Sequence, residues 1–445
     1  MLPFADMNRW LVSAVCVSFL SCAGALAQAS AQPGLQPGAA PCDQALHRAA
    51  SLVLESQKKL PGQRVEDMST EVPAALRQQI TGFKDTLAAS TDAILHCETV
   101  DTPAQQLETE LAREFHANQK LPSPTNAGSG KATTETQNGN YGADLKVSVS
   151  TPQAAPKLRL IDYQFGIECG NDNVLLVYEP SKKNAEIVSS NGVKADSGMP
   201  DGFVRALRWQ SDSYDQISGA FGDFFQYAVL PATNGKPWRL AAAHGMPWCT
   251  STMSGFQMDL LEPQDGTAHV VWHDQQTYRR GDFDPRMTLR GNGFELRAEV
   301  NTIELEQIVR KEIFRYAVDG DTVQRAQPIA VDGRGFVDAW LQAPWNEVKE
   351  WSLPEGMAGF EKVHEAFARG RKDGNITYSY GPLRGCLMKG QYEVEIDADP
   401  GGPQFYAIRE APNGYTMVNF GTTQDERCSG PDLMKKQAAG AKRSK

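Results

Sequence analysis

The spacing of apolar residues in the first part of the chain predicts helices. From Leu76 to Ile94 apolar side chains recur on one face of a helix with about 3.6 residues per turn, and a weaker stripe runs from Leu46 to Val53. Pro61-Gly62 breaks the chain between these stripes, and a short third helix is expected from Ala104 to Phe115. We therefore expect a helical hairpin domain over residues 42–117.

Residues 157–354 carry the pattern of β-strands instead. In Phe294–Val300 apolar and charged side chains alternate, as in a strand with one buried face. Asp319-Gly320 separates two further β-like runs, and an Asp-Gly pair at such a place favours a tight hairpin turn. Helical patterns at 336–341 and 345–351 follow. We expect this segment to form a β-rich central domain.

Residues 355–434 combine a predicted helix, at 359–369, with a small antiparallel β unit. Its strands are expected at 376–380, 392–396, 405–408 and 415–420. The predicted fold class is therefore multidomain α+β: an N-terminal helical hairpin, a β-rich central domain and a small C-terminal antiparallel β unit. No fixed-period repeat is visible, so a propeller or a solenoid lacks its sequence signature.

Two segments lack any periodic pattern. Residues 118–156 are rich in Pro, Gly, Ser, Thr, Asn and Gln, a composition that predicts a flexible linker because it offers too little apolar area to offset ordering entropy. Residues 435–445 form a basic tail of small residues, for which we expect disorder.

The first 31 residues are typical of a secretory signal peptide. Arg9 precedes a short apolar run, and Ala25-Leu26-Ala27 and Ala29-Ser30-Ala31 resemble cleavage sites. The choice between Met1 and Met7 as the start stays open. Cys22 allows an alternative, a lipoprotein anchored at that cysteine. We expect an exported protein, periplasmic or extracellular, with no transmembrane span, because no later apolar run is long enough.

Six cysteines remain once the signal segment is removed, and an even number in an exported chain indicates disulfides. Their order along the chain favours sequential pairing, two to each folded part. The expected bridges are Cys42–Cys97, Cys169–Cys249 and Cys386–Cys428.

Composition narrows the function classes further. The 445 residues include 44 Lys and Arg against 54 Asp and Glu, a net charge of −10, and 41% are hydrophobic. An acidic balance argues against a nucleic-acid partner, and this apolar fraction argues against a wholly disordered chain.

Searches for strong catalytic motifs find none: the chain lacks a G-x-S-x-G elbow, an H-E-x-x-H pair, a phosphate loop and a dinucleotide fingerprint. His269 and His273 lie in a strand-like run, where four residues span about 13 Å, too far to share one zinc ion. Cys249 close to His244 suggests a thiolate nucleophile, but a bridged cysteine would be inert. We expect no metal and no cofactor.

The stretch around Trp238 is the best candidate for binding. It mixes flat aromatic faces with hydrogen-bonding groups, a combination suited to sugars or peptides. The candidate residues are Trp238, His244, Trp248, Trp272, His273 and Asp274. The simpler interpretation is that these tryptophans fill a β core.

The sequence thus favours a non-enzymatic binding or interaction protein of the bacterial cell envelope or a secreted one, with a glycan or another envelope protein as partner. The alternative is a secreted hydrolase acting on a glycan or peptide, with its site near His244, His273 and the Asp282–Asp284 turn.

Overall fold

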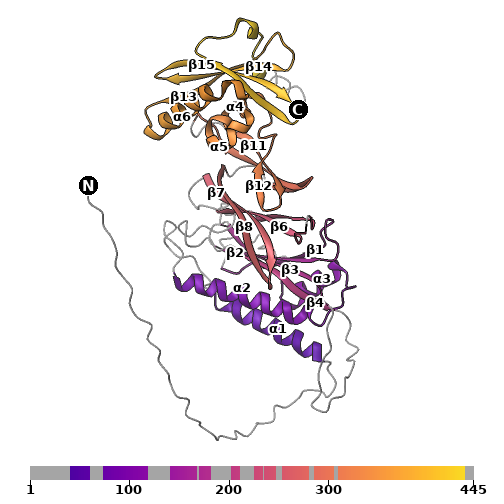
Figure 1. Cartoon of the computed structure of the whole chain (residues 1–445). Helices are drawn as coiled ribbons and strands as arrows, with labels where there is room; N and C mark the ends of the chain where they lie inside the picture. Colours follow the sequence, from indigo (N-terminus) through magenta and orange to yellow (C-terminus); the bar gives the residue numbers. More distant parts are fainter. Residues whose placement is uncertain are drawn as a thin grey trace, which may run out of the picture. The chain divides into compact units, whose positions relative to one another are not determined.

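The computed structural model describes residues 41–60, 74–118, 141–167, 170–181, 202–210, 225–233, 235–246, 253–279, 285–304 and 309–435 (Figure 1). The fold is α+β. The predicted signal peptide, the tail beyond residue 435, Trp248, Cys169, Cys249, Asp282 and Asp284 lie outside these residues.

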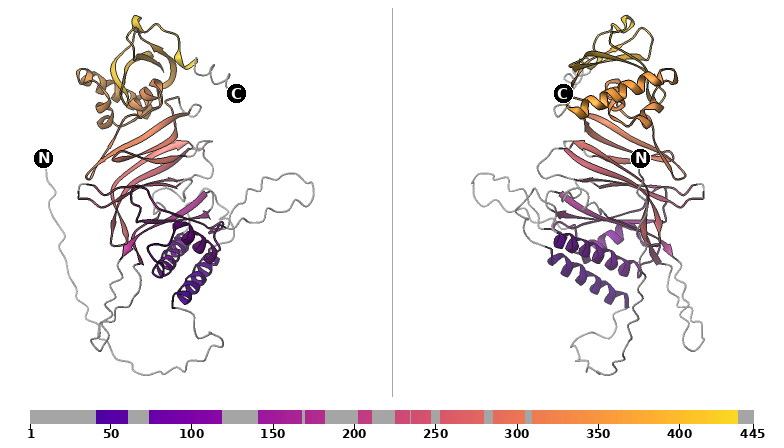
Figure 2. Two further views of the ribbon diagram at one scale, coloured as in Figure 1. Left: turned by 90° about the vertical axis from the view of Figure 1, so that its right-hand side faces the viewer. Right: turned by 60° about the vertical axis from the view of Figure 1, so that its left-hand side comes forward.

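Three helices open the described chain: α1 (Pro41–Lys58), α2 (Ala74–Leu95) and α3 (Ala104–Glu114). The predicted helices are confirmed, and α1 and α2 lie side by side (Figure 2). The apolar face of α2 is buried, with Ile80, Phe83 and Leu87 fully covered. These side chains share one core with the first β-sheet. The helices therefore pack against strands of the predicted central domain; the division into separate domains stays a prediction.

The strands of the described residues form four antiparallel sheets of four strands, each in chain order. The first sheet contains β1 (Lys146–Ser150), β2 (Arg159–Ile167), β3 (Gly170–Ser181) and β4 (Gly202–Gln210). The second contains β5 (Phe225–Leu230), β6 (Arg239–Met246), β7 (Met253–Gln264) and β8 (Thr267–Arg279). The third contains β9 (Arg286–Arg290), β10 (Gly293–Asn301), β11 (Val309–Asp319) and β12 (Thr322–Arg325). The fourth contains β13 (Thr377–Gly385), β14 (Gln391–Asp399), β15 (Gly402–Ala411) and β16 (Gly414–Gly421).

Strand β1 lies within the segment 118–156, for which the sequence predicts a linker. It alternates exposed and buried side chains and pairs with β2 along its whole length. The Asn118 side chain also bonds both backbone groups of Val147, at 2.9 and 3.0 Å. The C-terminal part of the predicted linker is thus part of the first sheet; residues 119–140 lie outside the described chain.

The first three sheets pack face to face. The helices cover one face of the first sheet, and its other face shares a core with the second sheet through side chains such as Leu175, Leu207 and Leu240. The opposite face of the second sheet packs on the third through Phe256, Phe294 and neighbouring residues.

The fourth sheet shares its core with α4 (Gly333–Gln342), α5 (Trp345–Val348) and α6 (Met357–Asp373), which are joined by short 3-10 turns at Lys349–Trp351 and Pro354–Gly356. Trp340 of α4 is fully buried there. Helices α4 and α5, which precede the boundary predicted at residue 354, therefore pack with the fourth sheet; the boundary itself stays a prediction.

The structure contains the predicted Cys386–Cys428 disulfide. Cys97 is also disulfide-bonded, and the side chain of its expected partner, Cys42, is not among those described. The described helices include none that is long and apolar enough to cross a membrane.

Candidate functional site

The sequence-predicted candidates do not converge on one place, because neighbouring residues of a strand face opposite sides. Trp272 and Asp274 on β8 face the third sheet: the Trp272 ring contacts Tyr316, with 4.7 Å between ring centroids, and Asp274 accepts a hydrogen bond from the Tyr316 hydroxyl. His273, between them, faces the first sheet, as does His244 on β6, which meets the edge of Trp209. Trp272 packs between two sheets, as the simpler interpretation expected.

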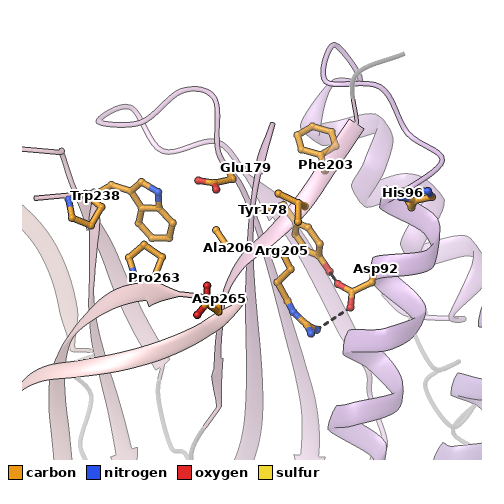
Figure 3. Close-up of a pocket in the computed structure, with 13 residues that line it drawn as sticks. Asp92, His96, Tyr178, Glu179, Phe203, Arg205, Ala206, Trp238, Pro263 and Asp265 are labelled. Atoms are coloured by element: carbon orange, nitrogen blue, oxygen red, sulfur yellow. Dashed lines mark hydrogen bonds and ion pairs between the residues drawn. The ribbon is translucent and has the colours of Figure 1, made fainter. Parts of the chain in front are cut away.

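Only Trp238 among the described candidates lines the cavity shown in Figure 3. This cavity of about 740 Å³ lies between the C-terminal half of α2, strands β3 and β4, and the loops at the ends of β6, β7 and β8. Its lining side chains are Asp92, His96, Tyr178, Glu179, Phe203, Val204, Arg205, Ala206, Pro237, Trp238, Pro263 and Asp265, with Gly266. A cavity of this size is in the range of natural ligand pockets.

One end of the cavity is fixed by a polar triplet. Arg205 on β4 forms an ion pair with Asp92 of α2 at 3.1 Å, and the Tyr178 hydroxyl donates to the other Asp92 oxygen at 2.7 Å (Figure 3). Burial of Tyr178, and the negative charge of the neighbouring Asp92, raise the pKa of the phenol well above its usual range. The hydroxyl therefore stays protonated and donates its hydrogen bond to Asp92. The triplet joins the helix to the sheet and satisfies the charge of Asp92.

The other end carries Trp238 beside Pro263 and the β7–β8 turn (Figure 3). Asp265 and Gly266 have φ angles of 49° and 77°, as a two-residue type I′ hairpin turn requires. A Cβ at Gly266 would lie 3.3 Å from the Arg205 carbonyl oxygen, so glycine also lets this turn approach β4 closely. The local turn chemistry thus holds Asp265 at the mouth of the cavity.

Two carboxylates of the lining, Glu179 and Asp265, make no ion pair with any described residue, and Glu179 is only half-buried. Unlike Asp92, they are free to accept hydrogen bonds from a ligand. Trp238 supplies an aromatic face close to them. The cavity therefore combines a stacking surface with charged acceptors.

A second polar group lies between the first and second sheets. Asp259 of β7 and His273 of β8 are cross-strand partners, with 2.7 Å between the Asp259 Oδ1 and the His273 Nδ1. Asp259 is buried and His273 is half exposed. Burial raises the pKa of Asp259, and hydrogen bonds from His273 and Trp209 oppose that rise. With Nδ1 engaged, the His273 Nε2 remains available for other contacts.

His244 lies near this pair but is far more deeply buried than His273. It is 3% exposed, and burial, together with the charges of Lys84 and His273, lowers its pKa to about 3. It is therefore neutral at physiological pH. Among the residues that the structure describes, no group of three or more His, Cys, Asp or Glu side chains is placed to hold a metal ion.

Sequence reasoning missed most of the cavity lining. Asp92, Tyr178 and Arg205 come from separate elements and carry no local motif. Asp265 could have been found, because its Asp-Gly turn is readable in the sequence.

Comparisons with known proteins add no family. No protein-family model matches the chain, and no curated protein matches it in sequence. The arrangement of side chains is thus the basis for a functional proposal.

Proposed function

We propose that the chain is an exported, non-enzymatic binding protein of the bacterial cell envelope, or a secreted one, and that the cavity beside Trp238 binds a glycan. The observation that carries the proposal is the convergence of Trp238, Glu179 and Asp265 on one cavity of about 740 Å³. The signal-like first 31 residues and the disulfide Cys386–Cys428 support export.

A glycan suits this lining for physical reasons. The apolar faces of sugar rings stack on flat aromatic side chains, and sugar hydroxyls donate to carboxylate oxygens. Asp92 is already held by Arg205 and Tyr178, so it positions the wall, while Glu179 and Asp265 remain for the ligand.

Tryptophan fluorescence against a panel of cell-envelope glycan fragments tests this proposal. We expect a saturable change in the wild type and its loss in Trp238→Ala. Trp272→Phe is the matched control, since it removes a tryptophan packed between the second and third sheets and should keep binding. No response across the panel, or an unchanged response in Trp238→Ala, would contradict the proposal.

A second candidate function is hydrolysis of a glycan or peptide, and the Asp259–His273 pair favours it. An aspartate on Nδ1 fixes the histidine tautomer and leaves Nε2 to act as a general base on water or a hydroxyl. Turnover of chromogenic glycosides or peptides by the full chain, lost in His273→Gln and kept in His269→Gln, would support this candidate. Absence of turnover would favour binding alone.

A further inference from the structure

The charges that line the cavity beside Trp238 do not balance. Among the described residues of the lining, Arg205 is the only lysine or arginine, against the three carboxylates of Asp92, Glu179 and Asp265. Arg205 and Asp92 form an ion pair at 3.1 Å, so their charges offset each other. The lining is therefore left with two negative charges, on Glu179 and Asp265.

The basic residues on either side of Trp238 in the sequence are engaged elsewhere. Lys236 forms ion pairs with Asp321 at 2.8 Å and with Glu262 at 3.8 Å. Arg239 is buried, and its Nε lies 3.2 Å from the Glu262 carboxylate. Neither side chain lines the cavity. These two cations therefore serve the contact between β7 and the β11–β12 turn.

A further cation lies at the helix end of the cavity. The Arg159 guanidinium contacts the ring of Phe203, with 5.4 Å from Cζ to the ring centroid. It donates to the carbonyls of Val100 and Thr102 at 3.2 and 3.3 Å, and it does not line the cavity. Figure 3 shows Phe203 beside α2, whereas Trp238 lies at the opposite end. Arg159 therefore holds the loop after α2 to the first sheet.

The two unpaired carboxylates and Trp238 together suit a cationic ligand. The face of an indole ring attracts a cation, and a carboxylate makes charge-assisted hydrogen bonds with an ammonium group. A neutral ligand would displace water from Glu179 and Asp265 without supplying the opposite charge, which is costly. The net charge of −10 on the whole chain also favours the approach of a cation.

We propose that the glycan bound in this cavity is a cationic one, a hexosamine oligosaccharide whose amino groups are free rather than acetylated. The inference rests on the proposed glycan-binding function and adds to it the chemical class of the sugar. The ammonium groups of the ligand donate to Glu179 and Asp265, while the apolar face of a sugar ring stacks on Trp238.

Calorimetric titration of the full chain with three oligosaccharides of equal length tests the inference: a glucosamine oligomer, its fully N-acetylated form and a galacturonic acid oligomer. The titrations are run near about pH 6, where a primary amine carries its proton. Acetylation removes the charge and keeps the ring face and most hydroxyls. We expect the amino oligomer to bind about tenfold or more tightly than the acetylated one, and the anionic oligomer to bind most weakly. Added salt should narrow this preference.

The double variant Glu179→Gln, Asp265→Asn assigns the preference to the cavity. It should lower the affinity for the amino oligomer more than for the acetylated one, so that the two agree within about twofold. Glu355→Gln with Glu361→Gln is the matched control, because it also removes two negative charges, from exposed positions near α6, and should keep the preference of the wild type. Urea midpoints of both double variants check that the fold is retained.

The outcomes separate this inference from the function on which it rests. Equal affinity for the amino and acetylated oligomers, or a preference that persists in the Glu179/Asp265 variant, would overturn the cationic ligand and leave glycan binding intact. Failure of all three oligomers to bind would also overturn it, and the panel of glycan fragments then decides on the proposed function separately. Tight binding of the anionic oligomer would overturn the charge argument directly.

Discussion

Two regions of this molecule use the same types of charged residue to different ends. In the first, which we call the buried network (Arg310, Glu312, Arg325 and Asp338), each charge meets a partner. Asp338 is fully buried on α4 and accepts from Arg310 Nε at 2.5 Å and from the Ile303 N–H at 2.8 Å. It also accepts from the Tyr380 hydroxyl, and so connects α4, β11 and β13.

The second region is the cavity beside Trp238. There Asp92 is paired, but Glu179 and Asp265 have no ionic partner among the described residues. Charges saturated by protein partners stabilise the fold and leave nothing for a ligand. Charges left unsaturated around a cavity contribute little to stability and are available for binding. The difference predicts opposite effects of mutation in the two regions.

The largest effect is expected in the buried network. Asp338→Ala leaves the Arg310 Nε–H, the Tyr380 hydroxyl and the Ile303 N–H without their acceptor, and should lower the free energy of unfolding by about 3–5 kcal/mol. Urea denaturation followed by far-UV circular dichroism measures it. Asp321→Ala, at the exposed ion pair with Lys236, is the control and should leave the urea midpoint unchanged. Equal effects of the two variants would remove the basis of the comparison.

A smaller effect is expected from two titratable groups between the first and second sheets. Burial raises the pKa of Asp162 from 3.8 to about 6, so the folded state binds this proton more tightly than the unfolded chain. Stability from this group therefore falls as pH rises through that interval, by about 3 kcal/mol in total. His244 acts in the opposite direction: with its pKa lowered from 6.5 to about 3, stability falls as pH decreases through that range.

Variants separate the two contributions. In Asp162→Asn, acidification from about pH 6.5 to pH 4 should destabilise the protein more than it does the wild type, because only the His244 effect remains. In His244→Asn the same acidification should be less harmful or even stabilising. Urea midpoints across this pH range measure both, and identical pH profiles for the two variants would refute these assignments.

Asp92→Asn should have an intermediate effect. The Tyr178 hydroxyl and Arg205 keep a neutral acceptor but lose the charged one, which should lower the free energy of unfolding by about 1 kcal/mol. Thermal unfolding monitors the change. A loss as large as that of Asp338→Ala would place Asp92 in the same class as the buried network.

The smallest effect on stability is expected for Glu179→Gln and Asp265→Asn. With no ionic partner to lose, each should stay within about 0.5 kcal/mol of the wild type in urea denaturation. A marked loss of stability in either variant would show that these carboxylates serve the fold and would remove them as ligand contacts.

Local patterns in the sequence predicted much of this fold. The apolar stripe of α2 and the hairpin near Asp319-Gly320 are confirmed. The two turn residues of that hairpin are Gly320 and Asp321, because Asp319 pairs with Thr322. Strand β1 was missed because its five residues adjoin a polar stretch whose composition dominated the prediction. The sequence also did not show that the four described sheets share one topology, a meander of four strands. Their strand lengths range from four residues in β12 to thirteen in β8, so no regular spacing reveals the shared topology.

The site was less predictable than the fold. Trp238 stood out by its chemistry, whereas Asp92, Tyr178 and Arg205 meet only once α2 packs on the first sheet. Trp272 and His273 are adjacent in the sequence, but the alternation of β8 sends them to opposite faces. Which polar residues share a cavity is decided by packing between elements distant in the sequence, and no local pattern encodes it.

The central claim, that unsaturated groups around Trp238 form a ligand site, is tested most directly by calorimetric titration of the full chain with cell-envelope glycan fragments. The double variant Glu179→Gln, Asp265→Asn is titrated in parallel. We predict saturable binding by the wild type and an affinity about tenfold lower or weaker still in the variant, at unchanged folding stability. Equal affinity in both proteins, or no heat of binding in the wild type with any fragment, would contradict it.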